Sequence, residues 1–197
     1  VYVLFVGDSA GMVMLGYPTT NQINMEEMLT FCSGVSRGVN RAMIIADMPF
    51  GSYQISTSEA IANAIRFIKV GCHAVKLEGG IEIIDTVKAI VKTGIPVMGH
   101  IGLKPQTSTL WEGYKFQGKT KFSGLKLIED AKALEEAGVF SIVLEMVTSE
   151  VADIISKNIS IPTIGIGSGL SCDGQVLVLH DMLGIYEDMK PKFVKRY

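Results

Sequence analysis

Apolar positions along the chain fall into short continuous runs that alternate with amphipathic segments. The runs that we predict to be strands are VYVLFV at 1–6, AMIIA at 42–46, HAVKL at 73–77, IPVMG at 95–99, FSIVL at 140–144, IPTIGI at 161–166 and the weaker KFV at 192–194. Nearly unbroken apolar runs of this length are typical of strands that are covered on both faces. The pattern therefore predicts a buried parallel sheet.

Between these runs, apolar residues recur at helical spacing. The helices predicted from this spacing span 25–36, 57–70, 81–93, 123–137 and 149–157. A glycine follows four of them, at Gly38, Gly71, Gly94 and Gly138. Glycine adopts the left-handed conformation that ends many helices at little cost. Ser56 and Glu59, in the segment STSE, predict a capping box at the start of the helix at 57–70.

Helices that alternate with buried strands indicate parallel βαβ units, which form either an eight-stranded barrel or an open doubly wound sheet. Polar residues at the carboxyl ends of five predicted strands distinguish the barrel from the open sheet. These residues are Asp8, Asp47, Glu78, His100 and Glu145. A barrel gathers residues from many strand ends on one rim, whereas an open sheet gathers its site at one switch point. We therefore predict an α/β fold, a TIM (β/α)8 barrel forming a single domain over residues 1–197, with the first strand before residue 1.

Composition and charge narrow the range of partners. The chain has 197 residues, 48% of them hydrophobic, and a formal net charge of −2 without a long basic run, so nothing favours nucleic acid. No stretch approaches the ~18 apolar residues of a membrane span. The three cysteines, Cys32, Cys72 and Cys172, lack CxxC spacing, which argues against a disulfide framework and favours a reducing compartment. We expect a cytoplasmic protein, although a targeting segment before Val1 stays possible.

The segment VKLEGG, at 75–80, places Lys76 and Glu78 on the same side of a strand. One interpretation is an internal salt bridge that fills the barrel. The other is a site for an anionic substrate beside a metal ion, because Asp8, Asp47 and Glu78 would together offer the hard oxygen ligands that suit Mg²⁺. No cluster of histidines and cysteines indicates zinc or copper.

Glu145 ends the segment FSIVLE, in which the residues before the acid are more apolar than those before any other candidate acid. Partial desolvation would raise its pKa and make it a proton acceptor near neutral pH. The alternative is an acid that merely reaches solvent, just as Asp8 or Asp47 taken singly could cap a helix or begin a turn. His100 also lies at a strand end, whereas His73 and His180 fit structural positions better.

Longer motifs extend through the whole chain in one order. They are VGDSAGMVMLGY, ADMPFGSYQ, VKLEGG, PVMGHIGLKPQ, EGYKFQGKT, DAKALEEAG, VLEMV, IPTIGIGSG, CDGQVLVLHDMLG and PKFVKRY. Together they closely resemble the ketopantoate hydroxymethyltransferase family. The resemblance implies a TIM barrel of the phosphoenolpyruvate-binding type and a homodecamer. It also places the family's first barrel strand before residue 1 and its C-terminal helical extension beyond Tyr197.

The same resemblance implies an activity. A hydroxymethyl group would pass from 5,10-methylenetetrahydrofolate to 3-methyl-2-oxobutanoate through a Mg²⁺-stabilised enolate, giving 2-dehydropantoate and tetrahydrofolate. This is the first committed step of pantothenate and hence coenzyme A biosynthesis.

The resemblance also implies a role for each residue of the candidate site. Mg²⁺ would be held by Asp8, Asp47 and Glu78, with Glu78 acting through water. The 2-oxo acid would be bound by Asp8, Ser9, Asp47, Lys76 and His100. Glu145 would be the proton acceptor.

Two other functions and one structural ambiguity stay open at this point. A Mg²⁺-dependent lyase or mutase of the phosphoenolpyruvate mutase and isocitrate lyase class would also use an oxo acid. Such enzymes carry a cysteine in a KKCGH-like loop, and this chain has GYKFQGK in the comparable region. A non-catalytic barrel would tolerate neutralised acids at the rim. Finally, QVLVL at 175–179 has the pattern of a strand, whereas the resemblance implies a helix capped by Asp173.

Overall fold

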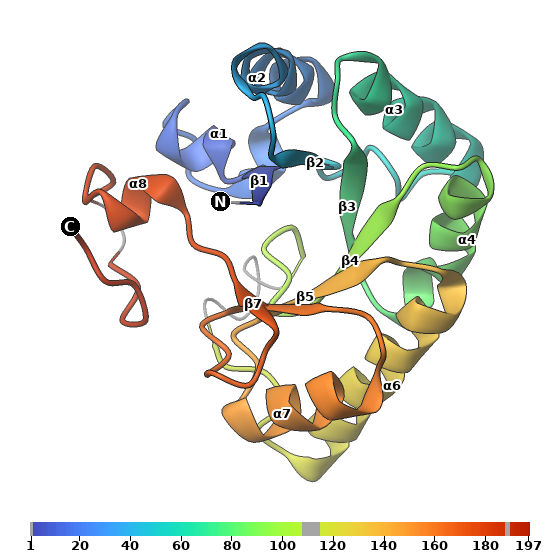
Figure 1. Ribbon diagram of the computed structural model, residues 1–197, viewed down its shortest axis with the longest axis vertical. Helices are drawn as coiled ribbons and strands as arrows, with labels where there is room; N and C mark the ends of the chain where they lie inside the picture. Colours follow the sequence, from blue (N-terminus) through green and yellow to red (C-terminus); the bar gives the residue numbers. More distant parts are fainter. Residues whose placement is uncertain (1, 108–114, 188–189) are drawn as a thin grey trace.

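The computed structural model describes residues 2–107, 115–187 and 190–197. Within these residues, seven strands form one parallel sheet in sequence order. The strands are β1 (Val3–Val6), β2 (Met43–Asp47), β3 (Ala74–Glu78), β4 (Val97–Gly102), β5 (Ser141–Glu145), β6 (Thr163–Ile166) and β7 (Gly174–Gln175). Figure 1 shows that the strands follow one another round an open curl. This sequential order is the order of strands in a barrel.

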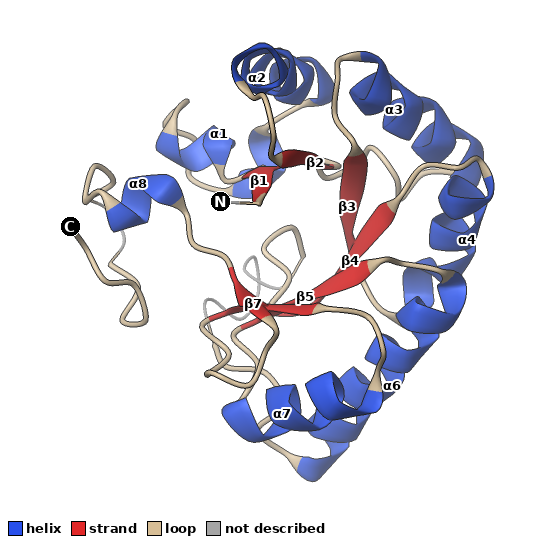
Figure 2. Cartoon of the chain, in the orientation of Figure 1, coloured by secondary structure: helices blue, strands red, loops and turns tan. Residues whose placement is uncertain are grey.

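The longer helices cover the convex outer face of the curl, as Figure 2 shows. The helices are α1 (Ala10–Val13), α2 (Met25–Gly38), α3 (Thr57–Lys69), α4 (Ile84–Lys92), α6 (Lys121–Ala137), α7 (Ser149–Asn158) and α8 (Leu179–Met182), and the 3₁₀ turns are η1 (Thr20–Gln22) and η2 (Ile81–Ile83). All five predicted helices are therefore present, with ends that differ by at most three residues from the predicted ones.

The helix termini follow local chemistry in most cases. Gly71, Gly94 and Gly138 have positive φ, as predicted. Gly38 does not: it is the last residue of α2, and an extended Val39 follows it, so that prediction was wrong. At the start of α3, the Ser56 side chain accepts a hydrogen bond from the Glu59 amide at 3.2 Å. This is the serine half of the predicted capping box.

Side chains alternate across the strands and divide the core into two layers. One face of the sheet packs against the helices, through residues such as Ile44, Leu77 and Leu144. On the concave face lies a smaller cluster that we call the inner apolar layer, which consists of Ile45, Ala74, Met98 and Val143. Because the strands are buried on both faces, their sequences are nearly continuous apolar runs.

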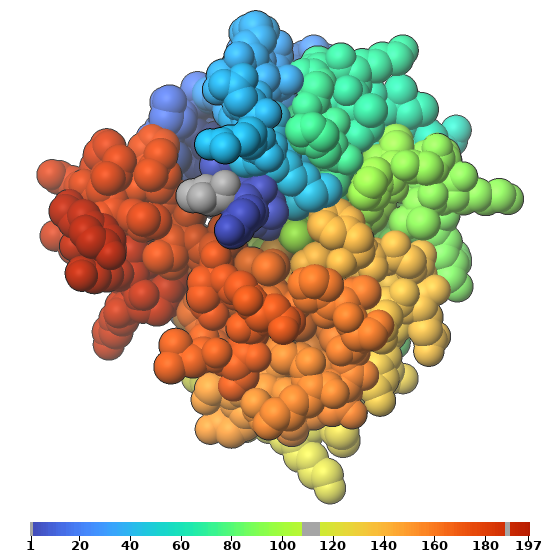
Figure 3. Space-filling model, in the orientation of Figure 1, coloured from blue at the N-terminus to red at the C-terminus, as the bar shows by residue number. Residues whose placement is uncertain are grey.

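The curl is open between its first and last strands. In the part of the chain that the structure describes, β7 pairs only with β6, and β1 only with β2. The fold is thus an α/β curled parallel sheet of barrel type. The C-terminal residues form a lobe at the edge of the molecule, shown in red in Figure 3.

The predicted strand at 192–194 was wrong. These residues form a turn and extended chain, and the Tyr197 amide donates to the Met182 carbonyl oxygen at 2.9 Å, which ties the segment to α8. A strand needs a neighbouring edge, and the two-residue β7 offers almost none.

The ambiguous segment at 175–179 is neither a full strand nor a full helix. Gln175 ends β7, an extended stretch follows, and Leu179 begins the short α8. Asp173 does not cap a helix, because its Oδ2 accepts hydrogen bonds from the amide and hydroxyl of Thr163, at 2.8 and 3.0 Å. It ties β7 to the beginning of β6.

Two further sequence expectations concern cysteines and membranes. The structure shows Cys32, Cys72 and Cys172 as free thiols, in agreement with the expected lack of disulfides. Among the described residues, no helix has the length and apolar character needed to cross a bilayer.

Candidate active site

A layer of ionisable side chains lies directly above the inner apolar layer on the concave face. We call it the polar layer; it consists of Asp8, Asp47, Lys76, Glu78, His100 and Glu145. Strand register brings its members together, because Asp47 is paired with Lys76 and Glu78 with His100 on neighbouring strands. Each strand residue of this layer lies two positions after an inward-facing residue, as Asp47 follows Ile45, so alternation points them all to the same side.

Lys76 lies at the centre of the polar layer. Its Nζ is 3.3 Å from Asp47 Oδ1 and 3.0 Å from His100 Nδ1. Burial lowers the pKa of this lysine, but the surrounding carboxylates together raise it more, so the net pKa lies above its usual range; they belong to Asp47, Glu78, Asp8 and Glu145. Lys76 is therefore a buried ammonium ion, and its closest carboxylate is on the neighbouring strand rather than Glu78 on its own strand.

His100 connects Lys76 to Glu145. The lysine ammonium has only donors, so His100 Nδ1 must accept from it. His100 Nε2 then carries the hydrogen, lying 2.9 Å from the Leu103 carbonyl oxygen and 3.2 Å from Glu145 Oε2. Burial and the nearby Lys76 charge hold the pKa of His100 well below its ordinary value. The imidazole is neutral and has a defined tautomer.

Glu145 has the properties of a base near neutral pH. Burial raises its pKa to about 7, although the Lys76 charge acts in the opposite direction. Its side chain is 16% exposed, against 4% for that of His100.

The backbone around Glu145 is also unusual. Met146, the next residue, has a φ of 47°, a left-handed conformation that is rare outside glycine and clusters at functional sites. On the neighbouring strand, Gly102 is paired with Glu145 and has a φ of 95°, and a Cβ there would lie 2.2 Å from the Glu145 carbonyl oxygen. Only glycine fits at position 102, and its absent side chain lets the β4 and β5 ends approach closely.

The three carboxylates predicted to hold a metal ion each have one oxygen held by an N–H group. Asp8 Oδ2 accepts from Gln106 Nε2 at 2.8 Å, and Asp47 Oδ2 accepts from the Asp8 amide at 3.2 Å. Glu78 Oε2 accepts from the Gln106 amide at 3.1 Å. These contacts fix the planes of the carboxylates.

The donor chemistry suits a hard divalent cation. Asp47 Oδ1 is buried, and the nearby Lys76 Nζ, at 3.3 Å, forms an ion pair with it but no well-aligned hydrogen bond, so this oxygen keeps lone pairs that a cation could use. Burial and the Asp47 charge raise the pKa of Asp8 to about 7, and a cation between the two carboxylates would relieve that repulsion. Burial likewise raises the pKa of Glu78 well above its usual value.

The same carboxylates do not form a closed metal cage. Among the described residues, no three or more histidine, cysteine, aspartate or glutamate side chains are arranged so that they could hold a metal ion together. Mg²⁺ keeps several water ligands in many sites of this type.

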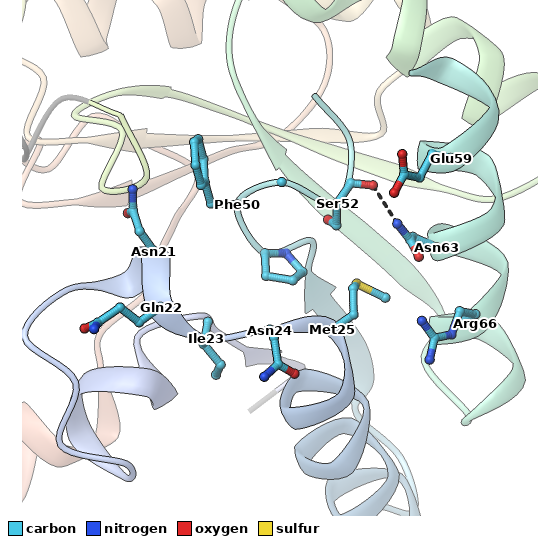
Figure 4. Close-up of a pocket in the computed structure, with 12 residues that line it drawn as sticks. Asn21, Gln22, Ile23, Asn24, Met25, Phe50, Ser52, Glu59, Asn63 and Arg66 are labelled. Carbon is cyan, nitrogen blue, oxygen red and sulfur yellow. Dashed lines mark hydrogen bonds between the residues drawn. The ribbon is translucent and has the colours of Figure 1, made fainter. Parts of the chain in front are cut away.

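A pocket of about 400 Å³ lies near this site, between α3, the start of α2 and the loop after β2. Figure 4 shows that Asn63 and Arg66 reach it from α3 and that Phe50 and Ser52 reach it from the loop. It contains no member of the polar layer, so the candidate chemistry is not located there.

The sequence itself matches a known family over its whole length. The sequence model of the family described as ketopantoate hydroxymethyltransferase matches residues 1–197. The chain belongs to this family. It is 62% identical to the 3-methyl-2-oxobutanoate hydroxymethyltransferase of Nitrosopumilus maritimus, covering 99% of this chain and 70% of that protein. It is 55% identical to the protein of the same name from Ignicoccus hospitalis, covering 100% of this chain and 74% of that protein.

Solved structures share the fold of this member of the ketopantoate hydroxymethyltransferase family. An oxaloacetate acetylhydrolase structure superposes with a TM-score of 0.67 at 15% identity, covering 94% of this chain and 70% of that one. A phosphoenolpyruvate phosphomutase from Streptomyces platensis gives a TM-score of 0.62 at 12% identity, covering 83% and 60%. At such low identity these likenesses establish the fold alone, and they agree with the predicted barrel type.

The structure brings together five of the predicted site residues of this family member on adjacent strands, with Asp8 beside them. Ser9 follows Asp8 at the start of α1, and its side chain caps nothing there. The motif EGYKFQGKT, at 112–120, begins outside the described residues.

Two residues of the site were missed by sequence reasoning. Gln106 and Tyr53 are both buried within the site, and both are hydrogen-bonded to Glu78. Gln106 is part of the motif PVMGHIGLKPQ, but an amide after a proline in a loop gives no local sign of a role.

Proposed function

We propose that this chain transfers a hydroxymethyl group from 5,10-methylenetetrahydrofolate to 3-methyl-2-oxobutanoate, forming 2-dehydropantoate for pantothenate biosynthesis. Family membership at 55–62% identity supports the reaction. One observation in the site carries the chemistry: a carboxylate with a pKa of about 7, Glu145, is linked through neutral His100 to the ammonium of Lys76. A base and a fixed positive charge thus lie on either side of one imidazole.

Glu145 is the proposed proton acceptor. Its carboxylate takes the proton from C3 of the 2-oxo acid, and the C–H electron pair moves to the ketone oxygen as the enolate forms. A pKa of about 7 leaves much of Glu145 ionised at neutral pH while it stays basic enough to accept a proton. C3 of the enolate then attacks the methylene carbon of the folate, and water supplies the hydroxyl group. Both C–N bonds to that carbon break, and tetrahydrofolate leaves with the C3 proton and one proton of the water on its nitrogens.

Lys76 stabilises the negative charge that develops on the ketone oxygen. Its ammonium is buried and held by Asp47 and His100, so no reorganisation is needed when the charge appears. His100, which is neutral, orients both Lys76 and Glu145 without adding a charge between them.

Mg²⁺ is the proposed metal, held by Asp8 and Asp47 directly and by Glu78 through water. When bound, it would withdraw charge from the carboxylate and ketone oxygens of the substrate and so make the C3 proton more acidic. The raised pKa of Asp8, which burial and the charge of the neighbouring Asp47 cause, supports this assignment, because a cation would relieve that repulsion. Ser9, beside Asp8, is proposed to hydrogen-bond to the substrate carboxylate.

Assembly and compartment follow from the resemblance rather than from the contacts. We propose a homodecamer in the cytoplasm, and the free thiols of Cys32, Cys72 and Cys172 agree with a reducing compartment. Light scattering on the purified chain, with the mass compared to ten copies of it, tests the assembly.

The first experiment measures exchange of the C3 proton of 3-methyl-2-oxobutanoate into deuterated water by NMR, with Mg²⁺ present. The unmodified chain should catalyse exchange, and Glu145→Gln should reduce it about 100-fold or more, the usual contribution of a general base. Asp153→Asn is the matched control, because Asp153 is an acid on α7 whose partner is the exposed Lys157. No exchange by the unmodified, Mg²⁺-loaded chain would contradict the proposed reaction, whereas undiminished exchange in Glu145→Gln would contradict only the base assignment.

A lyase or mutase of the phosphoenolpyruvate mutase class shares the fold of this chain. The solved structures of that class are only 11–16% identical to it, and no KKCGH-like loop is present in the sequence. The transferase is therefore the function that the site and the sequence support best.

A further inference from the structure

Gln106 connects more parts of the site than any member of the polar layer does by itself. It follows β4, is 1% exposed, and its side chain and backbone reach the segments after β1 and β2 and the end of β3. A buried glutamine with this number of partners has a specific arrangement, because each unsatisfied amide atom would cost free energy.

The neighbours determine which way the amide of Gln106 points. Two acceptors, Asp8 Oδ2 at 2.8 Å and the Met48 carbonyl oxygen at 3.0 Å, face one end of the amide. The Tyr53 hydroxyl lies 2.7 Å from the other end. Only the orientation with Nε2 toward the two acceptors uses both of its hydrogens. Gln106 therefore donates to the Asp8 carboxylate.

Tyr53 extends this chain to Glu78. A phenol has one hydrogen, and the short contact assigns it to Gln106 Oε1. The phenol oxygen then accepts from the Glu78 amide at 3.2 Å. The path runs from the Glu78 backbone through Tyr53 to Gln106 and on to Asp8.

The backbone of Gln106 makes a second connection to the same glutamate. Its N–H donates to Glu78 Oε2 at 3.1 Å, and its carbonyl oxygen accepts from Asn21 Nδ2 at 2.8 Å. One residue thus holds an oxygen of Asp8 through its side chain and an oxygen of Glu78 through its main chain.

We propose that Gln106 is a positioning residue, which orients the carboxylates of Asp8 and Glu78 so that their second oxygens face the divalent cation. This inference deepens the proposed function and rests on it. The terminal torsion of a carboxylate side chain has a broad energy profile, so a donor on one oxygen is needed to fix the plane of the group. Charge-assisted hydrogen bonds of this kind are the stronger ones.

The decisive variant is Gln106→Met, which keeps the length and volume of the side chain but removes the donor and the acceptor. The backbone contact to Glu78 remains, so the loss falls on Asp8. Partners of metal ligands typically contribute 10- to 100-fold to metal affinity, and we expect Mg²⁺ alone, titrated by calorimetry without substrate, to bind about 10-fold more weakly or worse. The Mg²⁺ concentration needed for half-maximal C3 exchange should rise by a similar factor, and the maximal rate should fall less.

Gln175→Met is the matched control. Gln175 is an exposed glutamine on β7, and its Nε2 donates to the Gly169 carbonyl oxygen at 3.2 Å, outside the network of Gln106. It should leave Mg²⁺ affinity unchanged. A purely structural role for Gln106 would lower the melting temperature and leave the affinity of the folded protein for Mg²⁺ as it was.

Should Gln106→Met fail to fold, Tyr53→Phe tests the same path by removing only the hydroxyl that holds Gln106 Oε1. It should weaken Mg²⁺ binding severalfold.

The outcomes separate this inference from the proposed function. If the unmodified chain binds Mg²⁺ and exchanges the C3 proton, while Gln106→Met or Tyr53→Phe binds Mg²⁺ equally well, the positioning role is wrong and the reaction stands. If the unmodified chain neither binds Mg²⁺ nor exchanges the proton, the proposed function itself is wrong.

Discussion

The inner apolar layer and the polar layer lie on the same strands, one side-chain step apart. Met98 and His100 on β4, or Val143 and Glu145 on β5, point to the same concave face. The lower residues gain free energy from burial, because apolar surface leaves water. The upper residues lose the free energy of hydration. The contacts between Asp47, Lys76 and His100 offset only part of that loss.

The two layers therefore differ in how burial affects their side chains. Burial raises the pKa of Asp8 and of Glu145 to about 7 and holds His100 neutral by lowering its pKa. Such shifts mark groups whose charged forms are unfavourable in the folded chain, and they are common where proton transfer takes place. The lower layer should therefore determine stability, and the upper layer should determine chemistry at some expense of stability.

The largest effect should come from Lys76→Met, which removes the central charge of the polar layer. Loss of a fixed charge at the developing oxyanion should reduce C3 exchange about 100- to 1,000-fold, measured by NMR with Mg²⁺ present. Lys69→Met, an exposed position at the end of α3, is the control and should exchange normally. Wild-type exchange in folded Lys76→Met would remove Lys76 from the mechanism.

Met98→Ala tests the lower layer two residues before His100. It leaves a cavity among buried side chains and should lower the free energy of unfolding by about 2–5 kcal/mol in urea titrations. The exchange rate per folded molecule should change little. Met14→Ala is the control, since Met14 is 56% exposed. A Met98→Ala protein that is stable but inactive would contradict the division between the layers.

The pH dependence of stability sharpens the same comparison. The pKa of Glu145 is raised from 4.5 to about 7, so the folded chain binds its proton more tightly than the unfolded chain does. The resulting contribution to stability is complete below pH about 4.5 and is lost as the pH rises through about 7. The melting temperature of the metal-free protein should therefore fall as the pH rises from about 5 to about 8. Calorimetry at a series of pH values measures this fall.

Glu145→Gln should reduce this slope, because the amide does not ionise, and should be the more stable protein at the alkaline end of the series. Asp153→Asn should leave the slope as it is. Identical slopes in the unmodified chain and in Glu145→Gln would show that Glu145 is not desolvated in solution.

The smallest effect should come from the surface. Lys157 and Asp153 form an ion pair one helical turn apart on α7, at 2.7 Å and largely exposed. Lys157→Ala should change the free energy of unfolding by no more than about 0.5 kcal/mol and leave exchange unaffected. High salt should reduce even that difference. A larger loss would mean that charge matters as much outside the site as within it.

The local sequence pattern was sufficient to predict most of the helices and strands of this molecule. Continuous apolar runs indicated β1 to β6, helical spacing indicated the five longer helices, and polar residues at strand ends indicated the polar layer. These features depend on neighbours within a few positions, because side chains alternate along a strand and recur every three or four residues on a helix. Where the pattern was short, as at 192–194, the prediction was wrong.

The tertiary structure alone decided which of these residues touch. Strand register paired Lys76 with Asp47 rather than with Glu78, and packing placed Gln106 against Asp8 across 98 positions of sequence. It also left the curl open between β1 and β7. A sequence determines by itself what each residue prefers locally, but a hydrogen bond between distant segments depends on how separate elements pack, and no local pattern contains that information.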